Sequence, residues 1–77
     1  MNKQRRKYLA EAVTKLEEAM DIVQTAMDDE QDAFDNMPEG LQYSERGERM
    51  EENISYLEDA TDQIDNAIST LQGIIDG

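Results

Sequence analysis

The sequence predicts an all-α fold, an antiparallel hairpin of two long helices that pack like a coiled coil. Apolar residues recur with alternating spacings of four and three in each half of the chain, which is the rhythm of a coiled-coil seam. One Pro- and Gly-containing stretch separates the halves. The 77 residues include no Cys and no His, so disulfides and the common zinc sites cannot reinforce a small core. We therefore expect a single domain, 1–77, that dimerises into a four-helix bundle.

The first helix is expected over about residues 3–36. Only Glu30 interrupts its apolar rhythm. When the chain folds back, Glu30 falls near Arg46 and Arg49, so we interpret it as part of a local salt bridge rather than as a buried functional carboxylate. The apolar residues of this seam are Leu9, Val13, Leu16, Met20, Val23, Met27, Phe34 and Met37.

The tip is expected over 37–44, where Pro38 and Gly40 interrupt the helical pattern. Two helices joined by so short a connection favour folding back on each other. Asn36 is a candidate cap for a short turn that begins near Pro38, and Ser44 is a candidate cap for the helix that follows.

The second helix is expected over about residues 45–75. Its rhythm has a gap at Gly47 and a polar insertion at Thr61, and a single polar residue in a seam often sets the register between helices. We expect Thr61 to lie near Met20. The apolar residues of this second seam are Tyr43, Met50, Ile54, Leu57, Ile64, Ile68, Leu71 and Ile75.

Small residues flank the seam on one side of both helices. We place Leu9 at heptad position d and Val13 at a, and continue the same spacing in the second helix, where Gly47 falls at a. Ala then recurs at position g, and three larger apolar or aromatic residues stand in the neighbouring c row. The two g rows of an antiparallel hairpin share one face, and small residues let another helix approach closely. We predict an interface here, with a second copy or with a different protein, centred on Ile22 and Tyr56 at similar heights. The predicted interface residues are Tyr8, Ala12, Ala19, Ile22, Ala26, Ala33, Tyr56, Ala60, Ala67 and Ile74.

Charge is distributed unevenly along a chain whose net charge is −12. Residues 1–15 hold five basic residues and one acid, whereas the rest holds two basic residues and eighteen acids. The acids occupy mainly heptad positions e, b and f. They form either a solvated face that keeps the protein soluble or a mimic of a nucleic-acid backbone that binds a basic groove on another protein. The predicted acidic surface near the tip comprises Asp28, Asp29, Asp32, Asp35, Glu39, Glu45, Glu48, Glu51 and Glu52.

The basic N-terminal segment, Lys3 to Lys7, is expected to fold back beside acids at the end of the second helix. We interpret it as pairing with Asp62, Asp65 and Asp76, within one chain or between subunits, rather than as a phosphate-binding segment. Because the acidic body repels phosphates, direct binding to nucleic acid is not expected.

No catalytic, metal or cofactor site is predicted. Asp28, Glu30, Asp32 and Glu39 have the spacing of calcium-loop ligands, but Ala33 stands where such a loop needs Gly. A helical hairpin offers no evident cleft that would separate the pKa values of an acid and a base. We expect a non-enzymatic, soluble, cytoplasmic protein that does not associate with membranes.

A family resemblance is carried by the start Met1–Lys7 and by the tip Phe34–Arg46, which reads FDNMPEGLQYSER. These stretches and the helical sequence around them resemble the small acidic hairpin proteins encoded by phages and prophages of Gram-positive bacteria. The resemblance implies action in a host-cell cytoplasm, where such proteins block host defence proteins, as anti-CRISPR inhibitors do. We therefore expect a protein that binds, and by this analogy inhibits, a host protein. The alternative is an assembly protein whose apolar face serves only self-association.

Overall fold

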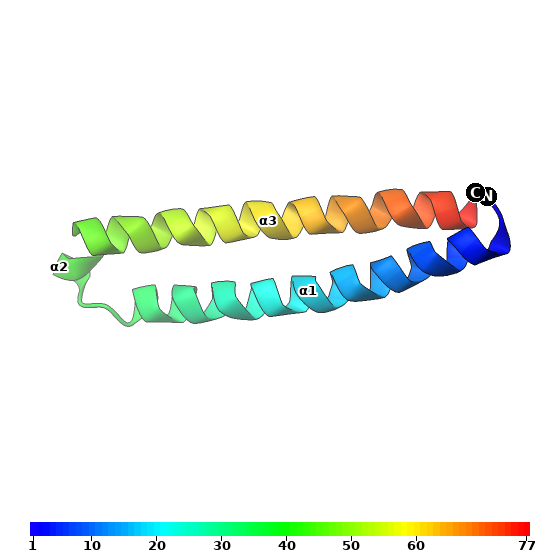
Figure 1. Ribbon diagram of the computed structural model, residues 1–77. Helices are drawn as coiled ribbons and strands as arrows, with labels where there is room; N and C mark the ends of the chain where they lie inside the picture. Colours follow the sequence, from blue (N-terminus) through cyan, green and yellow to red (C-terminus); the bar gives the residue numbers. More distant parts are fainter.

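The computed structural model describes residues 1–77 and contains three helices and no strand. Two long helices, α1 (Lys3–Asp35) and α3 (Glu45–Asp76), run side by side, and the short helix α2 (Glu39–Gln42) closes the turn between them (Figure 1). The two chain ends meet at the opposite end of the rod (Figure 1). The helical hairpin predicted from the sequence is therefore confirmed.

The molecule is a rod of 58 × 14 × 13 Å. Its radius of gyration is 17.3 Å, whereas a compact domain of this length would have one of about 11–12 Å. None of the helices has an apolar stretch long enough to cross a lipid bilayer.

The seam follows the predicted rhythm. Val13 is buried with an exposed fraction of 3%, and the other apolar seam residues of α1 and α3 are half-buried. Tyr43 is the exception, because it ends α2 and is exposed rather than packed in the seam. Val13 and Gly47 are the only buried residues, so the hairpin has little interior of its own.

Helix ends are capped partly as predicted. The hydroxyl of Ser44 accepts a bond from the backbone N–H of Gly47 at 3.3 Å, which confirms Ser44 as the cap of α3. The start of α1 is capped by Asn2, whose side chain accepts from the N–H of Arg5 at 2.8 Å. The prediction for Asn36 is wrong. It ends α1 with a helical backbone, and Pro38 occupies the N-cap position of α2 without a side-chain bond.

The gap in the second seam is the point where the tip contacts α3. A Cβ atom on Gly47 would lie 2.6 Å from the carbonyl carbon of Gln42 and 2.8 Å from its Cα. The side chain of Gln42 in turn donates to the backbone oxygens of Phe34, at 3.0 Å, and Met37, at 3.4 Å. Gly47 and Gln42 therefore join the end of α1, the tip and the start of α3 into one unit.

Candidate protein-interaction face

The candidate site is the face on which the two g rows and the adjoining c rows lie, and we call it the alanine face. Its larger side chains reach solvent, with exposed fractions of 70% for Ile22, 63% for Tyr56 and 61% for Tyr8. Ile74 is also exposed. Exposed apolar side chains grouped on one side of a small protein mark an interaction surface. The alanine face comprises the ten predicted interface residues together with Lys15, Asp29, Arg46, Arg49, Asn53, Gln63 and Thr70.

The alanines are not equally covered. Ala12, Ala19 and Ala60 are half-buried by the neighbouring helix. Ala26, Ala33 and Ala67 are exposed. The row therefore forms a low strip beside the seam, over which the backbone of another helix can approach closely.

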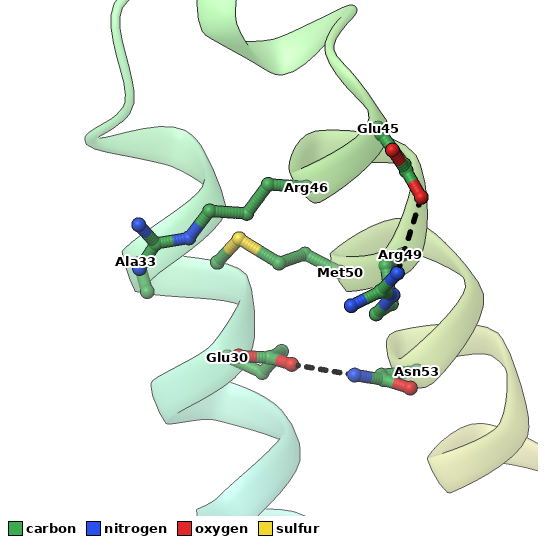
Figure 2. A pocket seen from close by; sticks show the side chains of 7 residues that line it. All are labelled: Glu30, Ala33, Glu45, Arg46, Arg49, Met50 and Asn53. Carbon is green, nitrogen blue, oxygen red and sulfur yellow. Dashed lines mark hydrogen bonds and ion pairs between the residues drawn. The ribbon is translucent and has the colours of Figure 1, made fainter.

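Register across the seam is defined by one side-chain hydrogen bond. The amide of Asn53 donates to the carboxylate of Glu30 at 3.1 Å (Figure 2). Because the two helices run antiparallel, each residue before Glu30 in α1 lies opposite the residue that is equally far after Asn53 in α3. Tyr56 therefore lies opposite Met27, and Ile22 lies opposite Thr61. Ile22 and Tyr56 are thus offset by about 8 Å along the axis, at 1.5 Å per residue, so the expectation of similar heights is wrong.

Glu30 is half-buried, but its predicted salt bridge with Arg46 or Arg49 is not formed. Arg49 pairs instead with Glu45, one turn earlier on its own helix, at 3.3 Å. The register provides the reason, because it places the Asn53 amide opposite Glu30 while the c-row Arg49 side chain lies next to Glu45 (Figure 2). The hydroxyl of Thr61 donates to the oxygen of Leu57 in its own helix at 2.9 Å, so the cross-helix polar contact is at Glu30.

An open depression of about 560 Å³ lies at the tip end of the alanine face. The side chain of Arg46 extends across it toward Ala33 of α1 (Figure 2). Its walls combine two cations, two carboxylates and an amide with the apolar side chains of Ala33 and Met50. The lining residues are Glu30, Ala33, Glu45, Arg46, Arg49, Met50 and Asn53.

Acids surround the rest of the rod. All nine residues of the predicted acidic surface are exposed, and among them only Glu45 forms an ion pair. Asp29 alone belongs to the alanine face, because it stands in the c row. No group of three acidic side chains is arranged to hold a metal ion.

The predicted pairing of the basic N-terminal segment with α3 does not occur within the chain. The pair between Arg49 and Glu45 is the only salt bridge in the molecule. The register explains the error for Asp62 and Asp65, which lie opposite Asp21 and Glu18, far along α1 from Lys7. Asp76 lies at the height of Lys7, but its carboxylate is not paired.

Three features of this site had only a weak signal in the sequence. Asn53 occupies a g position like the alanines, and nothing in the rhythm identifies it as the partner of Glu30. The heptad spacing places Lys15 in the same c row as Ile22, but a charged residue there gives no sign that it belongs to an apolar interface. Gly47 was visible as a gap in the seam, but its contact with Gln42 depends on how the tip folds.

The fold and this face define the class of the protein as a helical hairpin with one apolar, sparsely charged face and one acidic face. No family model, curated protein or solved structure matches the chain.

Proposed function

We propose that the chain is a non-enzymatic interaction protein and that its alanine face joins two copies into a four-helix bundle. The observation that carries this proposal is the small amount of interior in the hairpin. Val13 is the only apolar side chain that is buried. Chains of this size without disulfides or metals usually gain the missing core by association.

The exposed surface supports the same proposal. A compact monomer of 8.8 kDa exposes about 4,800 Å² by the usual scaling with mass. The hairpin exposes 5745 Å², an excess of about 950 Å². Each partner in a standard protein–protein interface buries about 800 Å². The excess is therefore the size of one such interface.

Sedimentation equilibrium over a micromolar concentration range tests the proposal. We expect a mass of twice 8.8 kDa that falls as the protein is diluted. Replacing Ile22 and Tyr56 together by Glu places two charges in the apolar face and should give a monomer. The matched control replaces Gln24 and Ser55 by Glu, which adds the same charge at exposed positions of the opposite face. A wild-type monomer at high micromolar concentration would contradict the proposal.

A second function, binding and inhibition of a host protein, is supported by the acidic surface. Its carboxylates are exposed and, apart from Glu45, have no basic partner. Unpaired charges spaced along helices can occupy a basic groove that normally holds a nucleic-acid backbone. Packing of the alanine faces leaves this acidic surface outward, with the exception of Asp29. On this proposal the acidic surface selects a partner that binds nucleic acid, and the resemblance to phage proteins implies that this partner is a host protein.

A pull-down from bacterial lysate at low and high salt tests this second function. We expect a basic nucleic-acid-binding protein to be retained at low salt and released at high salt. Neutralising Asp28, Asp32, Glu48 and Glu52 with the corresponding amides should abolish its capture. A control that neutralises four exposed acids farther from the tip, Glu11, Glu18, Asp62 and Asp65, has the same net charge and should retain it. Equal loss in both variants would contradict a defined acidic site.

A further inference from the structure

Two opposite charges stand on the α1 side of the alanine face. Between Tyr8 and Ala33, the g and c rows of α1 hold eight residues, Tyr8, Ala12, Lys15, Ala19, Ile22, Ala26, Asp29 and Ala33. Only Lys15 and Asp29 are charged. Both are exposed, and neither forms an ion pair within the chain.

Lys15 and Asp29 stand at equal distances on either side of Ile22, two helical turns away in each direction. Residues seven apart lie on nearly the same side of a helix, so the three form one line. A two-fold interface is self-complementary, which means that if residue i contacts residue j of the partner, then j contacts i. When a second copy of this line is reversed and placed against the first, its negative residue meets the positive one, its positive residue meets the negative one, and the apolar residues meet at the centre.

We propose that the second copy packs antiparallel, with α1 on α1 of the partner and the two-fold axis passing close to Ile22. This inference rests on the proposed dimer and specifies its geometry. Lys15 of each copy then lies beside Asp29 of the other, and the two Ile22 side chains meet at the centre. The alanines also match, because Ala12 falls opposite Ala33 of the partner and Ala19 opposite Ala26.

The other two-fold arrangement leaves Lys15 without an acidic partner. If the axis runs along the rod, α1 packs on α3 of the partner at the same height. The register defined by Glu30 and Asn53 then places Lys15 near Ala67 and Thr70, and Asp29 near Asn53 and Tyr56. None of these residues is charged. Arg49 of the partner lies about 7.5 Å along α3 from the position that faces Asp29 and can reach it, but Lys15 meets no acid, so only the antiparallel arrangement gives both ions partners.

The same axis also gives a suitable position to the arginines of α3. Reversal about Thr61, which lies opposite Ile22, brings Arg49 beside Gly73 of the partner and Arg46 beside Asp76. These residues form the last turn of the partner's α3. Cations are favoured at a helix C-terminus, where unpaired backbone carbonyls carry partial negative charge.

Charge reversal tests the arrangement through mixing of variants. Lys15→Asp gives a face with acids at both positions, and Asp29→Lys gives a face with lysines at both. Each variant alone should form a dimer with a Kd raised about tenfold or more, because attraction becomes repulsion at two symmetric sites. Mixed in equal amounts, the two variants should form a heterodimer with a Kd within about threefold of the wild-type value.

The control pair is Lys7→Asp and Asp32→Lys, which makes the same charge changes outside the alanine face. Neither control should weaken the dimer, and their mixture should show no preference for the heterodimer. Reversal variants that dimerise like the wild type would overturn the arrangement while leaving the proposed dimer in place. A wild-type monomer would overturn both.

A distance measurement provides an independent readout. The chain has no Cys, so Tyr8→Cys introduces one site for a spin label. In the antiparallel dimer the two labels are separated by 28 helical residues, or about 42 Å at 1.5 Å per residue. With the axis along the rod, both labels lie at the same end. A distance of about 40 Å supports the antiparallel arrangement, and one below about 20 Å overturns it.

Discussion

Replacing Gly47 by Ala tests whether the close approach between the tip and α3 holds the hairpin together. Gly47 lies inside α3, where Ala is intrinsically better than Gly by about 1 kcal/mol. On helix propensity alone the variant should therefore be stabilised. The structure predicts the opposite, because the added methyl group would overlap the backbone carbonyl group of Gln42.

The size of the effect follows from what must move. The atoms that the new methyl group meets are backbone atoms, the carbonyl carbon of Gln42 at 2.6 Å and its Cα at 2.8 Å, so no side-chain rotation relieves the contact. Overpacking of this kind costs about 1–3 kcal/mol. If overpacking costs about 3 kcal/mol and the better helix propensity of Ala returns about 1 kcal/mol, the free energy of unfolding falls by about 2 kcal/mol. For a chain of this length that is a fall in Tm of about 10 °C.

The assay is thermal unfolding followed by circular dichroism at one fixed protein concentration, since association makes Tm concentration-dependent. Gly73→Ala is the matched control, because a Cβ there has no neighbour within 4 Å. It should raise Tm by a few degrees, reflecting a gain of about 0.5–1 kcal/mol. If both variants raised Tm alike, the contact between Gly47 and Gln42 would not constrain the fold.

Three further predictions concern the caps, the cross-helix bond and the overall charge. Ser44→Ala should lower the free energy of unfolding by about 0.5–2 kcal/mol, measured by urea denaturation, because the N–H of Gly47 loses its acceptor; Ser55→Ala, at an exposed position within α3, should cost little. Asn53→Ala should lower the free energy of unfolding by about 1–3 kcal/mol by the same method, since Glu30 is half-buried and loses its only hydrogen-bond donor. An unchanged urea midpoint would show that water replaces the amide fully. Raising NaCl from about 10 mM to about 0.5 M should increase Tm through screening of a net charge of −12, and a Tm that falls with salt would contradict self-repulsion as the dominant electrostatic effect.

The periodic parts of the molecule could be predicted from the sequence. Apolar spacing alone identifies the seam residues of the two long helices, with Tyr43 at the tip as the exception. The expected helix limits of about 3–36 and 45–75 lie close to the observed Lys3–Asp35 and Glu45–Asp76. This works because a heptad pattern describes which side of a helix each residue occupies, a local property. The alanine face could be recognised for the same reason.

Contacts across the seam could not be predicted in the same way. The sequence predicts that Glu30 pairs with an arginine, whereas Glu30 contacts Asn53. It also predicts that Asn36 caps the turn at the tip, whereas Asn36 ends α1. Both errors depend on how the tip is folded, because one extra or missing residue there shifts every pair along the rod. Spacing within each helix carries no information about that shift.

Because the chain reverses direction only once, at α2, the contacts between α1 and α3 are expected to form in a defined order during folding. Every pair between α1 and α3 encloses the tip, so the pairs are nested inside one another. The Glu30–Asn53 pair closes a loop with a separation of 23 residues, whereas contacts near the chain ends close almost the whole sequence. Because the entropy lost on closing a loop grows with its length, we expect the hairpin to zip from the tip toward the termini during folding. Amide hydrogens of the first and last turns should then be the first to exchange with solvent, through local fraying that leaves the tip paired.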